Sequence, residues 1–372
     1  MSDDLYDVAI VGAGPAGATA AIVLAQKGRK VVIVDRATFP RQTTCAGWLN
    51  TRCAPLLTDL GVKDKSLLKC PFSDVTLYRP DFSQSAKPTF EHTPGYLIDR
   101  ARFDNALVTT AANQGVNFVQ GCAATDLQLK ESSAVVELAD GRHLDGRLLL
   151  LASGHRAELF ERLGLAASKG EAPIWAAQVD APLTGKAGPK KAQIGVILGL
   201  DNAGSFGICL LSTDRVSIGI NWVGEGTEAV PALVQLCRQA FQHQVVPVDL
   251  SDEAGSVTLS RSPASAALDM ESHVGKHTLV IGDAGGFISA ASNEGIYPAM
   301  WSAQIAGEVI DRALHSVHSQ DELMTFDSTW RMQMADYLRS PHTDIQFLLP
   351  LIFTNQSMAD RMGAAFFSGE NI

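Results

Sequence analysis

Clustered positive charge is what this 372-residue sequence most clearly lacks. Its 30 lysine and arginine residues are outnumbered by 40 acidic ones, for a formal net charge of -10 at pH 7. A protein that binds along a nucleic-acid backbone needs clustered basic residues to replace the counterions, so we expect no nucleic-acid partner. The chain also opens with Asp3 and Asp4, where a secretory signal would carry positive charge, so export is not expected.

Long apolar runs are missing as well. The longest, 18–25 and 347–353, fall short of the roughly 18 to 20 residues that a membrane-spanning helix needs. We therefore do not expect an integral membrane protein. The six cysteines are scattered without a C-x-x-C pair, and no metal-binding histidine pair is visible. Neither a disulfide framework nor a metal site is indicated, and a reducing cytoplasm fits best.

The strongest local signal covers residues 6–35. Tyr6–Val11 reads as a buried parallel strand, and an alanine-rich helix follows the glycine-rich turn and ends near Gly28. A second apolar, β-branched run covers Val31–Val34 and ends at Asp35. This segment therefore predicts a strand, helix and strand joined by a right-handed crossover.

The turn between the first strand and the helix has the pattern of a dinucleotide-binding loop. Its first glycine permits the turn, its second lets the backbone approach a pyrophosphate, and its third lets helix and strand pack closely. We expect Asp35 to accept the ribose hydroxyls, although a solvated loop acid is the plain alternative. The turn itself comprises Gly12, Ala13, Gly14, Pro15, Ala16 and Gly17.

The remaining chain predicts an α/β fold with two lobes. We expect a Rossmann-type cofactor-binding domain from residues 1–173 and 259–320, with an inserted mixed β-sheet substrate domain at 174–258. A helical C-terminal segment, 321–372, is expected to break at Pro341 and Pro350. Its apolar residues, among them Phe347, Leu348 and Phe353, either cover a substrate cavity or pack against the core, and packing is favoured.

Three further motifs, at 39–48, 99–104 and 282–295, make the sequence resemble a known superfamily. Over residues 6–314 it resembles FAD-dependent enzymes of the p-hydroxybenzoate hydroxylase type, and within them the geranylgeranyl reductase-like branch. The resemblance implies FAD as the cofactor. Beyond the glycine-rich turn, the residues it implies for FAD binding are Asp35, Arg36, Cys45, Ala46, Gly47, Arg100, Ala123, Gly282, Asp283, Gly295 and Ile296.

By the same resemblance, Arg100 should reach the FAD phosphates or ribityl chain, and Asp283 should bind ribityl hydroxyls. A helix-surface arginine and a simple helix cap are the respective alternatives. The helix that opens near Gly295 and Ile296 should direct its amides at the N1 and O2 edge of the flavin, which favours the reduced form.

Two residues are candidates for catalysis, Cys45 and Glu294. Cys45 stands where the reductase-like branch places a cysteine beside the isoalloxazine, so it could tune the flavin or donate a proton, or be an inert thiol. Glu294 is either a catalytic acid or a first-turn residue favoured by the helix dipole.

The sequence also departs from the branch. The loop 289–293 reads Ser-Ala-Ala-Ser-Asn where the branch has a proline and a glycine, and 206–211 replaces its substrate-lobe signature. These differences weaken the case for a prenyl substrate. The hydroxylases' middle motif survives only in altered form at 152–156, and the tryptophan and proline signature of the halogenases is missing.

Together these features predict an FAD-dependent oxidoreductase acting on an apolar or aromatic small molecule. NAD(P)H is the expected electron donor, with a redox partner protein as the alternative. Reduction of a carbon-carbon double bond by hydride from flavin N5 is favoured. The alternative is a monooxygenase that hydroxylates an aromatic or apolar metabolite through a C4a-hydroperoxyflavin. A second alternative is a flavin-binding sensor or scaffold without turnover.

Overall fold

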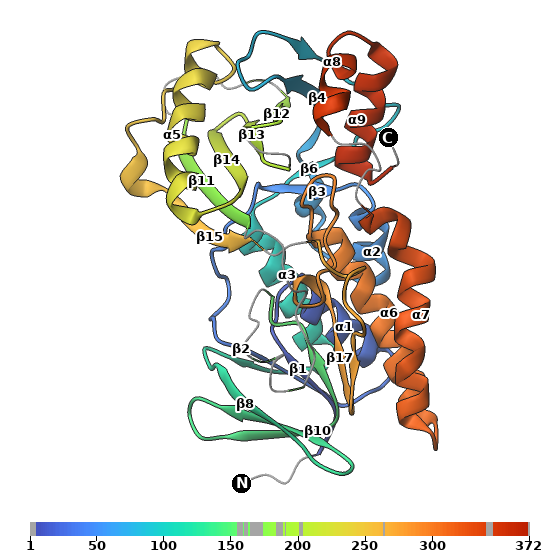
Figure 1. Cartoon of the computed structure of the whole chain (residues 1–372). Coiled ribbons are helices and arrows are strands. Elements are labelled where there is room, and N and C mark those ends of the chain that lie inside the picture. The colour runs from blue at the N-terminus through green and yellow to red at the C-terminus, as the bar shows by residue number, and fades with distance from the viewer. Residues whose placement is uncertain are drawn as a thin grey trace.

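The computed structural model shows two β-sheets that lie one above the other along the long axis of the molecule (Figure 1). It describes residues 5–154, 159, 163, 174–183, 189, 191–200, 204–262, 265–339 and 345–370. His155 and Arg156 of the altered middle motif and Pro341, the first expected break in the C-terminal segment, lie outside these ranges.

The first sheet has the order β16-β17-β10-β1-β2-β7, and β8 and β9 extend it as an antiparallel pair beside β10. β1 pairs in parallel with both β2 and β10, and β2 pairs in parallel with β7. Helix α1 forms the crossover from β1 to β2, and α3 lies on the connection from β2 to β7. The bounds are β1 Tyr6–Val11, β2 Val31–Asp35, β7 Asn117–Gln120, β8 Ala124–Leu129, β9 Ala134–Leu138, β10 His143–Leu151, β16 Val274–Gly275 and β17 Thr278–Val280.

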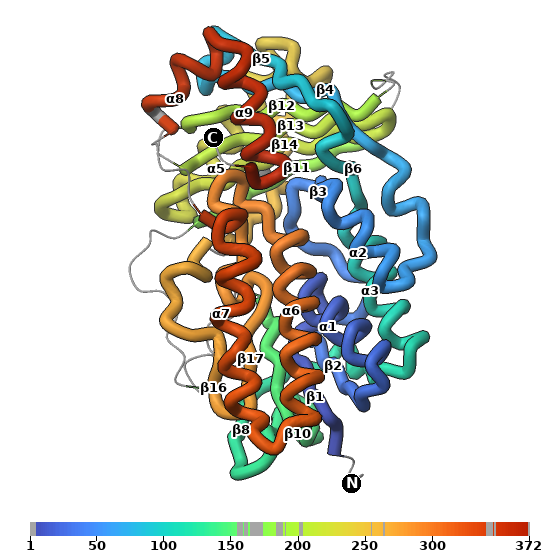
Figure 2. The backbone as a smooth tube through the Cα atoms, turned by 90° about the vertical axis from the view of Figure 1, so that its right-hand side faces the viewer, coloured from blue at the N-terminus to red at the C-terminus, as the bar shows by residue number. Residues whose placement is uncertain are grey.

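Four helices pack together against one face of the first sheet, and Figure 2 shows α6 running between α1 and α7. The α1–α6 contact is close because Gly307 faces Val23, and a Cβ on Gly307 would lie 2.5 Å from Val23 Cγ1. These helices place the start of α6 at the top of the sheet. Their bounds are α1 Pro15–Gln26, α3 Arg100–Asn113, α6 Ile296–His315 and α7 Ser319–Leu338.

The second sheet has the order β15-β11-β14-β13-β12-β4-β6-β3, with β5 beside β4. Strands β11 to β15 are antiparallel neighbours, whereas β12 pairs in parallel with β4. This sheet therefore extends beyond 174–258, the range expected for the substrate lobe. The bounds are β3 Trp48–Asn50, β4 Pro71–Tyr78, β5 Ser85–Ala86, β6 Gly95–Leu97, β11 Ile174–Pro182, β12 Ala192–Leu198, β13 Phe206–Leu211, β14 Arg215–Val223 and β15 Thr258–Ser262.

Alternate residues of these strands build two separate cores. On one face, Ile218 and Ile220 pack with helix α5 (Gly226–Gln242). On the other, Ile208 and Leu210 belong to a cluster with helices α8 (Ile345–Ile352) and α9 (Gln356–Ser368). The period of two along each strand separates the two sets. The short elements that remain are α2 Cys53–Asp59, η1 Lys65–Leu68, η2 Ala254–Ser256 and η3 Gly282–Gly285.

The expected α/β class, with a Rossmann-type domain and C-terminal helices, is confirmed. The break at Pro350 is wrong, because Pro350 lies inside α8. Pro350 lacks the amide that would donate one of the helical hydrogen bonds, and the buried Leu349 and Ile352 hold this turn in place by packing.

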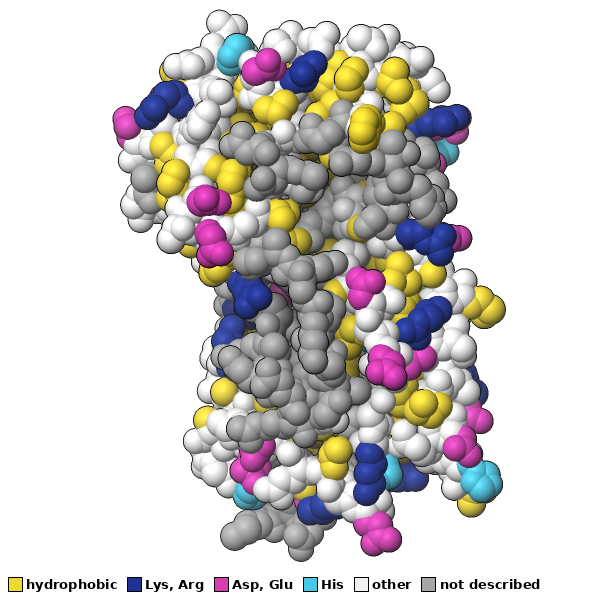
Figure 3. Space-filling model, viewed as in Figure 1, with side chains coloured by type: hydrophobic (Ala, Val, Ile, Leu, Met, Phe, Trp, Pro, Cys, Tyr) yellow, Lys and Arg dark blue, Asp and Glu magenta, His cyan; other side chains and the backbone are white. Residues whose placement is uncertain are grey.

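The expected packing of the C-terminal apolar residues applies to some of them. Leu348 is 9% exposed and Phe353 packs against the core that contains Ile208 and Leu210, whereas Phe347 is 77% exposed. Figure 3 shows apolar side chains gathered at the surface of the upper lobe, where α8 lies. No helix in the described part of the chain combines the length and apolarity that a bilayer crossing requires.

Candidate cofactor and substrate site

The glycine-rich turn has no room for side chains at its two ends. Gly12 has φ +101°, and a Cβ there would collide with the carbonyl oxygen of Ala152. A Cβ on Gly17 would collide with the carbonyl oxygen of Gly12. Pro15 occupies the first helical position of α1, where a missing N–H costs nothing. The backbone thus leaves the start of α1 open to a phosphate group.

Asp35 holds this turn from the end of β2. Its Oδ2 accepts a 2.8 Å hydrogen bond from Ala13 N, and its Oδ1 accepts one of 2.8 Å from Ala37 N. A recess of about 60 Å³ opens beside it, and Gly12, Arg36 and Ala123 line it with Asp35. Four residues expected to bind FAD, among them Asp35 for the adenosine ribose, therefore meet around one small recess.

Two arginines share one buried carboxylate next to the turn. Asp104 is fully buried, and it accepts bonds of 3.1 Å from Arg100 Nε and 3.0 Å from Arg100 Nη2. Arg41 Nη2 lies 3.2 Å from the same carboxylate, and Arg41 Nε is buried without a hydrogen-bond partner among the described residues. Arg41 Nη2 would also be 3.4 Å from a Cβ on Gly14.

Two guanidinium groups on one carboxylate leave positive charge and an unused donor beside the turn. This is the chemistry that a diphosphate requires. Burial acts to lower the pKa of Arg100, but the Asp104 carboxylate and the Cys45 thiol together raise it overall. The donors, the turn and the recess therefore fit FAD. Arg41 was not predicted as a site residue, although the 39–48 motif contains it.

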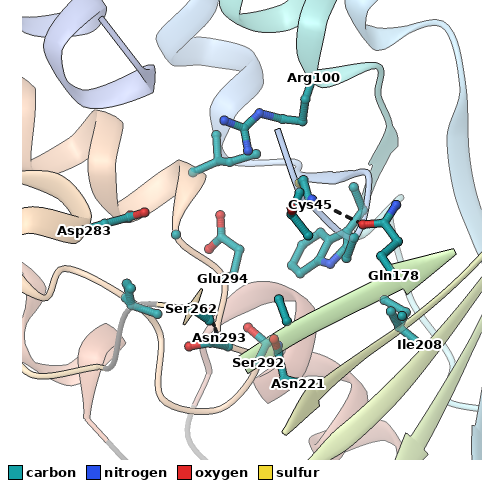
Figure 4. A pocket seen from close by; sticks show the side chains of 18 of the residues that line it. Cys45, Arg100, Gln178, Ile208, Asn221, Ser262, Asp283, Ser292, Asn293 and Glu294 are labelled. Atoms are coloured by element: carbon teal, nitrogen blue, oxygen red, sulfur yellow. Dashed lines mark hydrogen bonds between the residues drawn. The ribbon is translucent and has the colours of Figure 1, made fainter. Parts of the chain in front are cut away.

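A cavity of about 190 Å³ lies between the two sheets, and Figure 4 shows its lining. Eight of the predicted residues line this cavity from the side of the cofactor domain, and they come from distant parts of the sequence. The second sheet contributes the opposite wall, with Gln178, Phe206, Ile208 and Asn221. The predicted residues are Pro15, Cys45, Ala46, Arg100, Asp283, Glu294, Gly295 and Ile296.

The six other predicted residues line neither the recess nor the cavity, but they shape the walls of these two spaces. Ala13 binds Asp35, Gly14 approaches Arg41, and Gly17 packs under the turn. Gly47 N lies 3.4 Å from Cys45 Sγ. Gly282 has φ +62°, and a Cβ there would lie 2.7 Å from the Cβ of Ala16.

Burial raises the pKa of two carboxyl groups in the cavity. The pKa of Asp283 rises to about 6, and Arg100 opposes this rise. The pKa of Glu294 rises to about 7 for the same reason; hydrogen bonds from the Tyr337 hydroxyl and the Tyr297 amide oppose that rise, and Asp283 adds to it. Both groups can therefore exchange a proton near neutral pH.

Glu294 has a structural contact and a place at the site. Its Oε1 accepts a 2.7 Å bond from Tyr297 N in the first turn of α6, and its Oε2 accepts a 2.6 Å bond from the Tyr337 hydroxyl. Asn50 Nδ2 donates to the Tyr337 hydroxyl at 3.0 Å. The carboxyl group also lines the cavity, so both readings of Glu294 agree with its position. Tyr337 was not predicted.

Cys45 is half-buried in the loop before β3. Its backbone N donates to Gln178 Oε1 at 3.2 Å, which joins the cofactor loop to the substrate sheet. Trp48 lines the same cavity and packs edge-to-face against Phe367 of α9, with ring centroids 5.2 Å apart. Neither of these contacts between distant segments could be read from the local sequence.

Comparison with known proteins decides the family. The model of the FAD binding domain family matches residues 5–290, which is more than half of the chain. The chain belongs to this family. It is an FAD-dependent oxidoreductase, as the sequence resemblance implied.

Curated relatives include reductases. Menaquinone reductase of Mycobacterium tuberculosis is 28% identical over 333 residues, which cover 83% of this chain and 77% of the relative. Digeranylgeranylglycerophospholipid reductase of Methanocaldococcus jannaschii is 24% identical over 345 residues, covering 91% and 85%.

Solved structures share the fold across functional classes. A geranylgeranyl bacteriochlorophyll reductase-like protein of Thermoplasma acidophilum aligns with a TM-score of 0.76 at 16% identity, covering 99% of this chain and 97% of the other. The myxobacterial chondrochloren halogenase aligns with a TM-score of 0.73 at 19% identity, covering 99% and 86%. At these identities the likeness shows the fold alone.

Proposed function

We propose that this chain reduces a carbon-carbon double bond of an apolar small molecule. The observation that carries the proposal is the placement of Glu294, a buried carboxyl group whose pKa is about 7, in the wall of a largely apolar cavity. The two reductases among the relatives support the same class of reaction.

Reduction of a double bond needs a hydride for one carbon and a proton for the other. Bound FAD, once reduced, supplies the hydride. Burial raises the pKa of Glu294 to about 7, so this carboxyl group can carry a proton near neutral pH and is the main candidate for the proton donor, with Cys45 as the second. The product gains two hydrogen atoms, and Glu294 recovers its proton from water.

The protein's own residues orient the substrate and exclude water. Trp48, Phe206 and Ile208 give the cavity an apolar wall from the second sheet. Gly295 and Ile296 start α6 at the cavity, so the positive end of a 20-residue helix dipole faces the cavity and would stabilise negative charge on a reduced flavin bound there.

The electron donor in this proposal is NAD(P)H, with a redox partner protein as the alternative. The chain has one dinucleotide fingerprint, and FAD takes it. A nicotinamide donor would therefore bind only transiently. The proposed location is the cytoplasm.

An anaerobic turnover assay tests the function. Purified holoenzyme is mixed with NADH, NADPH or dithionite and with geranylgeraniol or a menaquinone, and the products are analysed by mass spectrometry. We expect products with one added hydrogen molecule per reduced bond. In a parallel assay in air, products that require oxygen and contain an added oxygen atom would overturn reduction in favour of the monooxygenase reading. Failure of NADH and NADPH to reduce the flavin, together with failure of every substrate to reoxidise the dithionite-reduced flavin, would favour the sensor.

A further inference from the structure

One end of the cavity carries hydrogen-bonding groups that the proposed hydride and proton transfer does not use. Ser292 lies in the cavity wall and is 5% exposed, and its hydroxyl is buried without a hydrogen-bond partner in the described part of the chain. A buried hydroxyl that lacks a partner is costly, which points to a missing ligand group at this position.

Asn221 lies at the same end of the cavity, on the substrate sheet. Figure 4 shows it near Ser292, at the edge of the strands and away from Arg100 and Asp283. In the sheet register Asn221 is opposite Ala176 on β11 and Phe206 on β13. It is therefore an isolated polar side chain in an apolar row, and no hydrogen bond among the described residues uses its amide.

The loop that carries Ser292 is fixed rather than adaptable. Ser289 N donates to Glu294 O and Asn293 N donates to Ser289 O, each at 2.9 Å. Asn293 has φ +53°, and its Nδ2 donates to Ser262 Oγ at 2.8 Å. This is the loop in which the chain departs from the reductase-like branch, so the position of Ser292 is a feature of this sequence.

The charges in the cavity define what such a ligand group can be. The charged side chains among the described lining residues are Arg100, Asp283 and Glu294, and all come from the cofactor domain. Arg100 is already paired with Asp104. A carboxylate or phosphate at the Ser292 end would therefore have no counter-charge, which makes a neutral group the better fit.

We propose that Ser292 and Asn221 form a subsite for a carbonyl oxygen on the substrate. A carbonyl oxygen has two lone pairs, so it can accept one bond from the serine hydroxyl and one from the asparagine amide. The substrate class is then an apolar molecule with a neutral carbonyl group, such as a quinone or an unsaturated ketone, and not a plain hydrocarbon. This inference rests on the proposed function in one respect, namely that the cavity is the place where the substrate binds.

Two ring compounds that differ in their carbonyl groups test the subsite. Menadione and methylnaphthalene are titrated into oxidised holoenzyme without an electron donor, and binding is followed by the change in flavin absorbance and fluorescence. Because a net hydrogen bond changes affinity by about five- to tenfold, we expect menadione to bind about tenfold or more tightly. Equal affinity for the two compounds would overturn the proposal.

Variants assign the preference to the two residues. Ser292→Ala and Asn221→Leu should each reduce the preference for menadione over methylnaphthalene about fivefold, and flavin content should stay at the wild-type level. Ser289→Ala is the matched control, since its hydroxyl is also buried and unpartnered but does not line the cavity. An unchanged preference in the first two variants would overturn the proposal.

The binding test separates this inference from the proposed reduction. No turnover occurs in the oxidised enzyme, so a failure to reduce any double bond would leave the carbonyl preference intact. Reduction of a prenyl hydrocarbon with no carbonyl preference would overturn the subsite alone.

Discussion

The hydroxyl of Tyr337 donates a 2.6 Å hydrogen bond to Oε2 of Glu294, which connects the last turn of α7 to the start of α6. This bond lowers the pKa of Glu294, against the larger effect of burial. Removing it with Tyr337→Phe should therefore raise that pKa further. If Glu294 donates the proton, activity falls as pH rises through about 7, and the variant should keep its activity to higher pH.

The pH profile of substrate reduction, measured with saturating donor, checks this prediction. Tyr297→Phe is the matched control, because Tyr297 contacts Glu294 through its backbone amide and keeps that bond in the variant. A shift of the alkaline limb in Tyr297→Phe equal to that in Tyr337→Phe, or no shift in either, would contradict the assignment.

Replacement of Glu294 itself separates its catalytic and structural readings. Glu294→Gln keeps an oxygen acceptor for Tyr297 N but loses the acidic proton. We expect turnover to fall about 100-fold with flavin content unchanged, in line with the loss of a general acid. Rapid anaerobic mixing of the reduced enzyme with substrate measures the step directly. Wild-type rates in the variant would leave Glu294 as a helix-capping residue only.

The apoprotein should lose stability as pH rises toward neutrality. Glu294 and Asp283 have folded-state pKa values of about 7 and about 6, above the ordinary values of 4.5 and 3.8. The folded state therefore binds more protons than the unfolded state between about pH 4 and pH 7, and that stabilisation is lost across this window. Glu294→Gln should remove a decline on the order of 2 kcal/mol. Urea unfolding at pH 5 and pH 7.5 tests this, and parallel curves for variant and wild type would contradict it.

Helix α9 should be an integral part of the core that the second sheet forms with α8 and α9. Phe367 is fully buried and packs on Trp48, Phe72 and Phe90, so Phe367→Ala should destabilise the protein by about 3 to 5 kcal/mol. Phe347→Ala is the matched control, because the 77% exposed Phe347 ring loses little on truncation. Chemical denaturation of the two variants measures the difference, and equal midpoints would be evidence against the packing of α9.

The glycine-rich turn gives the sharpest prediction for the cofactor. Gly17→Ala would press a methyl group against the carbonyl oxygen of Gly12, so FAD affinity should fall about tenfold or more. Gly255→Ala is the control, since a Cβ at Gly255 meets open space. The ratio of flavin to protein absorbance after gel filtration reports the result. Full flavin content in Gly17→Ala would contradict the close packing described for this turn.

The sequence predicted those parts of the site that depend on local patterns. The turn at Gly12–Gly17 and Asp35 occupy one strand-helix-strand unit, so their proximity follows from a single crossover. Motif likeness also placed Arg100, Asp283 and Glu294 around one cavity. The family comparison then confirmed FAD as the cofactor.

Contacts between distant segments could not be predicted in the same way. Tyr337 reaches Glu294 only because α7 packs along α6, and the amphipathic pattern of a helix does not identify its neighbour. Arg41, in the loop between β2 and β3, becomes a site residue through Asp104, which lies on α3. The parallel pairing of β4 with β12 joins strands more than a hundred residues apart, and no turn sequence specifies it.

Because β4 pairs with β12, residues 174–258 cannot be removed or exchanged as an independent unit. A fragment limited to residues 174–258 would leave one edge of β12 open and uncover the face that α8 and α9 protect. Redesign of substrate preference in this family by grafting would have to transfer 48–97 and the C-terminal helices together with the central strands. Substitutions of side chains in the cavity wall leave the pairing of β4 with β12 intact. Those that retain Gln178 also keep the hydrogen bond that joins the Cys45 loop to this residue of the second sheet.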